Sequence, residues 1–182
     1  DLRLSSYVYD IDTKMKRLSI RGGNTILYDN LVLATGSVPR RLPIEGANAK
    51  GVYVLRTHSD AKALTESLRK HPSPQLVIIG IGLEMGIALA KHAKVTLIGQ
   101  THVPLEGPLG RSVGGGLQTA IMNERPLRFL NAVDLVRIET DMNNSVRGVT
   151  VQPRARGSPE LFLAADVVLM STGAKPATDF LR

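Results

Sequence analysis

The sequence predicts an α/β fold, in which helices cover a parallel β-sheet and a three-stranded antiparallel meander is added to it. Three observations predict this class. Between residues 57 and 130, helical patterns alternate with short apolar runs that are rich in β-branched residues. Between residues 135 and 164, apolar and polar residues alternate along segments that turn residues separate. A last continuous apolar run, at residues 166–170, is typical of a parallel strand buried on both faces.

The bulk composition is that of a globular chain. With 182 residues, 43% of them hydrophobic, the chain can bury a core as one large or two small domains. No apolar run approaches the roughly 18 residues that suggest a membrane span, and no signal-peptide pattern opens the chain. The absence of cysteine excludes disulfide bonds and cysteine metal sites within these residues. It agrees with a reducing compartment, so we expect an intracellular location, cytoplasmic or mitochondrial.

The charge balance is basic, with a formal net charge of +7. One interpretation is a solvated surface with an excess of lysine and arginine, and the other is an acidic partner or an anionic cofactor. The chain has three phenylalanines, four tyrosines and no tryptophan, so it offers few rings for base stacking. We therefore do not expect nucleic acid as a partner.

The first part of the chain carries strand patterns. Three short stretches, joined by turn residues, indicate hairpin strands: residues 7–9, 17–20 and 25–27. The apolar run at 31–34 predicts a parallel strand buried on both faces, and it ends on Thr35-Gly36. The same pattern recurs where the run at 166–170 leads into Thr172-Gly173.

Residues 57–70 predict a helix. Thr57 or Ser59 can cap its first turn, and Pro72 follows its end. The apolar spacing of the following residues predicts, in order, a strand at 76–79, a helix at 83–93, a strand at 95–98, a helix at 110–122, a strand at 127–130 and meander strands at 135–140, 146–152 and 161–164.

Residues 76–86 read LVIIGIGLEMG and join a strand to a helix. Glycine at Gly80 and Gly82 would permit a tight turn and bring backbone N–H groups close to a pyrophosphate at the helix N-terminus. The usual fingerprint is G-x-G-x-x-G, but Met85 stands at the third glycine position and Gly86 comes one place later. The βαβ context favours a Rossmann-like dinucleotide-binding fold. The alternative is an ordinary turn that uses glycine for packing.

The end of the second strand of this unit lacks an acidic residue. A carboxylate there normally binds the adenosine ribose 2′-hydroxyl, but the chain reads Ile98-Gly99-Gln100-Thr101-His102. Its absence removes the preference for NAD over NADP. A 2′-phosphate would need a cation, and His102 is the nearest candidate; the alternative is a surface histidine without a role. The other histidines are scattered, so we predict no metal site and no catalytic side-chain set.

Three segments resemble the FAD-dependent pyridine nucleotide oxidoreductases. Residues 28–40 (YDNLVLATGSVPR) resemble their "ATG" segment, and residues 55–61 (LRTHSDA) resemble the entry to the helix before their NAD domain. Residues 168–178, with Gly173-Ala174-Lys175-Pro176, resemble the segment that returns to the FAD domain. The order is consistent nearly from end to end. The most similar branch is the group of ferredoxin reductases and apoptosis-inducing-factor-like proteins.

The resemblance implies that the chain is the middle of a longer flavoprotein. Family members begin with an FAD fingerprint upstream and end with a second FAD contact, and neither is found in these residues. We therefore predict a partial FAD-domain segment over 1–45, an NAD(P)H-binding domain over 46–171, and the start of the return to the FAD domain over 172–182.

The family pattern also implies a shortened glycine loop. The family reads roughly G-x-G-(F/Y)-I-G-(L/M)-E-(L/V)-A, and residues 83–91 match its later part directly. The alignment needs a three-residue gap, placed either after Gly80 or after Gly82, and both placements remain open. One fingerprint glycine is lost, and Gly86 is then an unrelated helix residue. Three helical residues correspond to about 4.5 Å, so the turn that would cradle the pyrophosphate is damaged.

The resemblance implies hydride transfer from NAD(P)H to flavin and electron passage to an acceptor, for example of the ferredoxin type. The contacts it implies with NAD(P)H are Gly80, Gly82, Glu84, Gly99, Gln100, Thr172, Gly173 and Ala174. The contacts it implies with FAD are Ala34, Thr35, Gly36 and Arg40. The isolated chain is expected to hold FAD poorly and to be inactive. The alternative is a degenerate, non-catalytic interaction or regulatory module of the same fold, with its cofactor site impaired by the gap beside Gly82.

Overall fold

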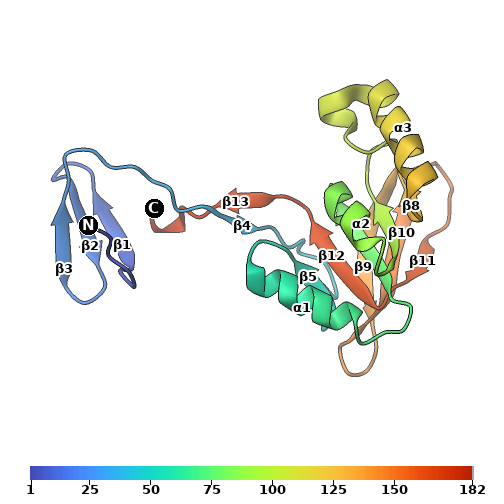
Figure 1. Cartoon of the computed structure of the whole chain (residues 1–182), viewed down its shortest axis with the longest axis horizontal. Coiled ribbons are helices and arrows are strands. Elements are labelled where there is room, and N and C mark those ends of the chain that lie inside the picture. The colour runs from blue at the N-terminus through green and yellow to red at the C-terminus, as the bar shows by residue number, and fades with distance from the viewer. Residues whose placement is uncertain (182) are drawn as a thin grey trace. The chain divides into compact units, whose positions relative to one another are not determined.

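The computed structural model describes residues 1–181 (Figure 1). Its packing divides the chain into two compact units, a smaller one of residues 1–38 with 175–181 and a larger one of residues 39–174. The chain passes between the units in strands β4 (Ser37–Pro39) and β13 (Ala174–Pro176), which pair with each other. The assignment of 46–171 to NAD(P)H and of the flanks to FAD stays a prediction, because packing alone does not identify a cofactor.

The smaller unit is built on a three-stranded antiparallel sheet, in the order β1-β2-β3. Its strands are β1 (Val8–Asp12), β2 (Arg17–Ile20) and β3 (Asn24–Leu27). The predicted hairpins are thus confirmed, with the first strand displaced toward the polar stretch that follows it. A short 3-10 helix, η1 (Asp179–Leu181), belongs to the same unit.

The buried parallel strand predicted at 31–34 is wrong. Residues 31–36 form no strand, and the side chain of Val32 is 86% exposed. A strand of that kind needs hydrogen-bonded neighbours on its edges and packing on both faces. None of the strands in residues 1–181 pairs with this segment. An apolar run without neighbours therefore stays extended and exposed.

The larger unit contains a five-stranded parallel sheet in the order β5-β12-β6-β7-β8. Its strands are β5 (Val52–Val54), β12 (Val167–Ser171), β6 (Gln75–Gly80), β7 (Lys94–Ile98) and β8 (Leu127–Leu130). All but β5 were predicted within a residue or two. β5 is only three residues long, so it leaves little periodicity to detect.

Three helices connect these strands. The first, α1 (His58–Leu68), begins where predicted: Thr57 Oγ1 accepts the N–H of Asp60, and the Asp60 carboxylate accepts the N–H of Thr57 in return. The second, α2 (Leu83–Leu89), ends four residues earlier than the predicted helix. The third, α3 (Glu106–Glu124), begins four residues earlier than predicted, but Gly110 (φ +74°) breaks its helical geometry, so the predicted start lies at this kink.

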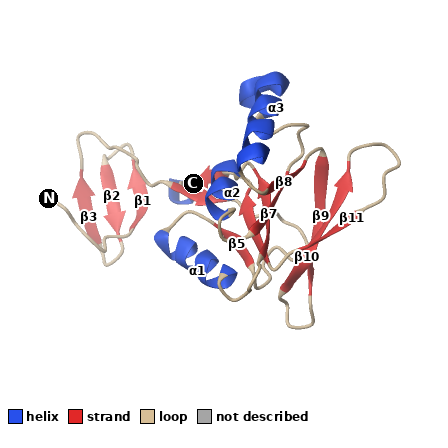
Figure 2. Ribbon diagram, turned by 45° about the vertical axis from the view of Figure 1, so that its right-hand side comes forward, coloured by secondary structure: helices blue, strands red, loops and turns tan. Residues whose placement is uncertain are grey.

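The sheet separates two apolar cores. One core joins its face to α1, α2 and α3, and the alternate residues Leu76 and Ile78 of β6 point into it. The other core joins the opposite face to the meander, and Val77 and Ile79 point into that one. The unit therefore has three layers: helices, parallel sheet and meander (Figure 2).

The meander is a three-stranded antiparallel sheet in the order β11-β10-β9, as predicted. Its strands are β9 (Val133–Thr140), β10 (Val146–Pro153) and β11 (Leu161–Ala164). The predicted α/β class with its parallel sheet and added meander is thus confirmed. Among residues 1–181, no helix is both long and apolar enough to cross a membrane.

Candidate functional site

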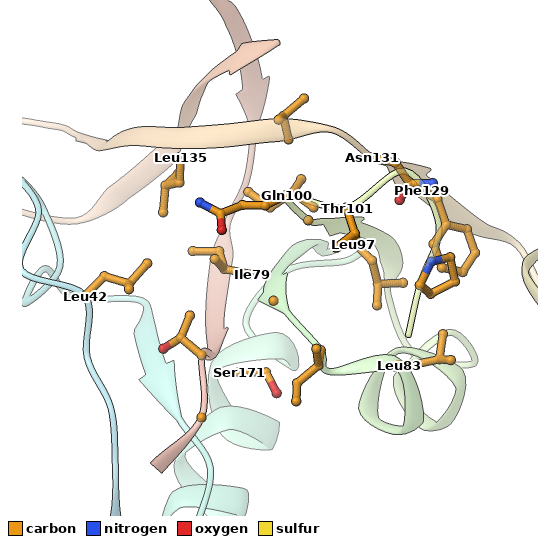
Figure 3. Close-up of a pocket in the computed structure, with 18 of the residues that line it drawn as sticks. Leu42, Ile79, Leu83, Leu97, Gln100, Thr101, Phe129, Asn131, Leu135 and Ser171 are labelled. Carbon is orange, nitrogen blue, oxygen red and sulfur yellow. The ribbon is translucent and has the colours of Figure 1, made fainter. Parts of the chain in front are cut away.

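A cavity of about 570 Å³ opens at the carboxyl ends of β6, β7, β8 and β12 in the larger unit (Figure 3). Most of its lining is apolar, with a few polar groups that include Gln100, Asn131 and Ser171. In open α/β sheets, ligands bind at the carboxyl ends of the strands, where the strand order changes direction. The volume and the mixed lining are typical of small-molecule and cofactor sites.

The cavity brings together part of the predicted NAD(P)H set. The predicted residues that line it are Gly80, Gly99, Gln100, Thr172 and Gly173. Gly82, Glu84 and Ala174 lie outside the lining. Of the residues predicted on the FAD side, Ala34, Thr35, Gly36 and Arg40, none lines this cavity.

Gly80 ends β6 in a conformation that only glycine adopts easily. Its φ is +92°, and a Cβ built on it would lie 2.5 Å from the carbonyl oxygen of Ser171 in β12. The next residue, Ile81, donates its N–H to the same carbonyl over 3.1 Å. Because Gly80 has no side chain, the ends of β6 and β12 can approach closely at the mouth of the cavity, where the Ile81 N–H bonds the Ser171 carbonyl.

Gly82 serves packing. It is buried, and a Cβ built on it would meet Ile78 Cγ2 at 2.5 Å and Ser171 Cβ at 3.0 Å. The N–H of Leu83 donates to the carbonyl of Ile81 over 2.9 Å. The N–H groups of Ile81 and Leu83 are thus bonded within the protein, so they are not offered to a ligand.

Gly86 packs α2 closely against β7, a role that its sequence position did not predict. It is buried on α2, and a Cβ built on it would lie 3.0 Å from Leu97 Cδ1 of β7. Close helix-to-strand packing is the role of the third glycine in the dinucleotide fingerprint. Although the family alignment treats Gly86 as an unrelated helix residue, it performs that packing one position later.

Gly99, where the acidic residue of the family would stand, leaves open space. A Cβ built on it meets no atom within 4 Å. Its backbone is fixed: the N–H donates to the carbonyl of Leu130 and the carbonyl accepts the N–H of Val133, each over 3.1 Å. A larger side chain could therefore stand here without displacing its neighbours.

Gln100 is held by two residues that the sequence pattern did not identify. Its Nε2 donates to Asp134 Oδ1 over 2.7 Å, and Arg154 Nη1 donates to its backbone carbonyl over 3.1 Å. Arg154 also binds the Asp134 carboxylate in a fork, with Nε and Nη2 at 2.9 and 2.7 Å. The hydrogen bonds from Arg154, and then from Gln100, hold the pKa of Asp134 below its ordinary value, while the Asp134 carboxylate raises the pKa of Arg154.

His102 lies beside the cavity loop but outside its lining. Glu106 accepts a hydrogen bond from Arg111 Nε at 2.6 Å and one from the His102 N–H at 2.8 Å, and these two bonds lower the pKa of Glu106. Arg111 Nη2 lies 3.1 Å from His102 Nδ1. Glu106 Oε2 lies 3.7 Å from the same ring nitrogen, so His102 Nδ1 stands between a cation and a carboxylate.

Comparison with known proteins matches all of residues 1–182 to the model of one family, described as pyridine nucleotide-disulphide oxidoreductase. The chain is 31% identical over 187 aligned positions, its whole length, to the ferredoxin–NAD(+) reductase component of the biphenyl dioxygenase system of Paraburkholderia xenovorans, and covers 43% of that protein. It is 26% identical to mouse apoptosis-inducing factor 3, again over its whole length and over 29% of that protein.

Among solved structures, a ferredoxin reductase of Rhodopseudomonas palustris superposes with a TM-score of 0.83 at 23% identity, over 97% of this chain and 42% of that one. At this level of identity the likeness supports the fold alone. The chain spans less than half of the length of each of these three proteins.

Proposed function

Because the chain belongs to the pyridine nucleotide-disulphide oxidoreductase family, we propose that its larger unit binds NAD(P)H as part of a longer, FAD-dependent oxidoreductase. Members of this family use FAD and NAD(P)H. In the proposed function, hydride passes from NAD(P)H to flavin and electrons pass on to an acceptor. A ferredoxin-type protein is the proposed acceptor, since one relative is named as a ferredoxin–NAD(+) reductase.

The cavity at the carboxyl ends of β6, β7 and β12 is the observation that carries this proposal. Predicted contact residues from three separate segments line it: Gly80, then Gly99-Gln100, then Thr172-Gly173. No residue of its lining is charged within the part of the chain that the structure describes. The lining can therefore enclose the rings and ribose groups of a dinucleotide while a few polar groups orient them.

The residues of this chain would bind and orient the cofactors rather than react with them. When bound, the nicotinamide supplies a hydride and the flavin accepts it, so the protein contributes binding and orientation. Thr172 is fixed because its Oγ1 donates to the carbonyl of Arg40 over 2.7 Å. Gly173 is fixed because its carbonyl accepts the Arg40 N–H over 2.8 Å. In this proposal the end of β12 would offer a fixed edge to the nicotinamide half, and the end of β7 would face the adenosine half.

The FAD side does not form a site in these residues alone. Ala34, Thr35 and Gly36 are exposed in an extended segment, and Arg40 is exposed as well. We infer that FAD is held mainly by other parts of the longer protein, so the isolated chain binds FAD weakly.

The glycine loop favours a second candidate, a non-catalytic module of the same fold. The N–H groups of Ile81 and Leu83 are bonded within the protein, and α2 has only seven residues. A loop that offers fewer free N–H groups to a pyrophosphate would bind a dinucleotide weakly or not at all. Direct measurement of binding separates this candidate from the first.

The test is a titration of the 182-residue chain with NADH and with NADPH, by calorimetry or fluorescence. We expect saturable binding of at least one of them, and we expect Gly99→Phe to abolish it by filling the cavity mouth. Gly116→Phe is the matched control, because Gly116 also has open space around its Cβ position and lies outside the lining, on α3. Absence of binding at millimolar concentration, or equal binding by the two variants, contradicts the proposal.

A further inference from the structure

We propose that Gln100, held in place by Asp134 and Arg154, replaces the missing acidic residue, accepts a hydrogen bond from the adenosine ribose and makes the site select NADH over NADPH. This inference rests on the proposed function, since it assigns a specificity to the same cavity. Gln100 lines the cavity, and Figure 3 shows its side chain extending into it between Leu135 and Ile79.

The partner of Gln100 fixes which end of its amide faces the cavity. Asp134 receives two hydrogen bonds from Arg154, and an ionised carboxylate is an acceptor only. The amide group that touches Asp134 must therefore be the NH₂, as the 2.7 Å contact of Nε2 requires. The amide oxygen is then turned away from Asp134 and is free to accept a hydrogen bond from a ligand hydroxyl.

The backbone around Gln100 is equally constrained. Arg154 Nη1 donates to the Gln100 carbonyl over 3.1 Å, and the N–H of Ala132 donates to the Thr101 carbonyl over 2.8 Å. With the two bonds of Gly99, to Leu130 at the end of β8 and Val133 at the start of β9, the loop is fixed on both sides of the amide. An acceptor held in this way loses little conformational freedom on binding, which favours affinity.

The surrounding charges favour a ribose hydroxyl over a 2′-phosphate. Arg154 is paired with Asp134, and Arg111 is paired with Glu106 over 2.6 Å. His102 lies outside the cavity lining, and its Nδ1 stands 3.7 Å from the Glu106 carboxylate. A phosphate group carries up to about two negative charges near neutral pH. It would stand beside the Asp134 carboxylate and the Gln100 oxygen, and both of these arginines already pair with carboxylates, whereas a hydroxyl can donate to Gln100.

The experiment compares dissociation constants for NADH and NADPH in the wild-type chain and in Asp134→Asn. We expect the wild type to bind NADH at least about tenfold more tightly than NADPH. A tenfold difference corresponds to the free energy of about one hydrogen bond. Asp134→Asn removes the negative charge beside Gln100 and leaves the Arg154 guanidinium without its counter-charge. It should therefore move the ratio toward NADPH by about tenfold or more.

Two further variants keep the test decisive. Glu160→Gln is the matched control: it also removes a carboxylate paired with an arginine of the meander, Arg137, but this carboxylate does not hold Gln100 as that of Asp134 does, so the ratio should not change. Gln100→Ala changes an exposed side chain and should weaken NADH about tenfold while leaving NADPH nearly unchanged. This result also decides the matter if Asp134→Asn does not fold.

The outcomes are distinct. Equal wild-type affinities, a wild-type preference for NADPH, or a ratio that stays constant in Asp134→Asn and Gln100→Ala overturns the role of Gln100 and leaves dinucleotide binding intact. If the wild type binds neither NADH nor NADPH, the proposed function fails, and the inference fails with it.

Discussion

Two segments of this chain share one sequence pattern and differ in burial and in strand pairing. Residues 31–36 and residues 167–173 are each an apolar run that ends in Thr-Gly. Val167, Val168 and Leu169 are fully buried in β12, between β5 and β6. Val32 and Leu33 are exposed in a segment that forms no strand. An apolar run therefore encodes the capacity to be a central strand, and its neighbours decide whether it becomes one.

The difference extends to the Thr-Gly end itself. Thr172 donates to the Arg40 carbonyl, and Gly173 accepts the Arg40 N–H, so this end is anchored at the edge of the cavity. At the other end, Gly36 accepts only the N–H of Ala177 among the bonds found in residues 1–181. Both glycines thus accept a backbone hydrogen bond, but only Thr172 and Gly173 line the cavity.

The largest contrast is expected for leucine truncation. Leu169→Ala removes a side chain with no exposed surface, so it should lower the free energy of unfolding of the larger unit by about 2–5 kcal/mol. Leu33→Ala truncates a side chain that is 49% exposed and should change stability by no more than about 0.5 kcal/mol. Urea unfolding followed by far-ultraviolet circular dichroism measures the larger unit, which contains α1, α2, α3 and Leu169, and amide hydrogen exchange of β1, β2 and β3 in urea measures the smaller unit, which contains Leu33. Equal losses in the two variants would contradict the contrast.

A smaller contrast is expected for the two threonines. Thr172→Val removes the hydrogen bond to the Arg40 carbonyl and should cost about 1 kcal/mol, whereas Thr35→Val removes no bond found in the structure and should be neutral. Circular dichroism in urea gives the stability of Thr172→Val in the larger unit, and hydrogen exchange of β1, β2 and β3 gives that of Thr35→Val in the smaller unit. The titration with NADH shows whether Thr172→Val also weakens binding. A destabilising Thr35→Val would show that residues 31–36 have a folded partner.

The features that the sequence predicted well are local or follow from topology. Thr57 and Asp60 lie three residues apart, which is the spacing of a capping box, and the helix begins there. Strands β6 and β7 were found from their apolar runs. The cavity lies at the carboxyl ends of parallel strands, where ligands bind in open α/β sheets, and five residues predicted to contact NAD(P)H line it.

The features that the sequence did not predict depend on long-range contacts. Asp134 and Arg154 reach Gln100 from residues 34 and 54 positions away, and neither belongs to a recognisable motif. The packing of Gly86 on Leu97 depends on how α2 crosses β7. Residues 31–36 are exposed because no neighbouring strand of residues 1–181 pairs with them, and the local sequence does not reveal whether such a neighbour exists. The residue types at these positions are compatible with many roles, and only the pairing of distant segments selects one.

The smallest expected effect is on the pH dependence of stability, and it distinguishes the anchored region from the unanchored one. Three carboxyls with lowered pKa values, Asp60, Glu106 and Asp134, lie in the larger unit. A pKa that is lower in the folded than in the unfolded state contributes stability above the unfolded value, and that stability is lost as the pH falls through the folded value. The larger unit should therefore weaken between about pH 5 and pH 3.

The matched measurement compares the urea midpoint of the wild type with that of a variant carrying Asp60→Asn, Glu106→Gln and Asp134→Asn. The variant should be less stable at neutral pH and should lose less stability than the wild type as the pH falls. Because all three carboxyls are near the surface, solvent screens them, and added salt should shrink the difference. A variant whose stability falls with pH as steeply as that of the wild type would show that other groups control the acid response.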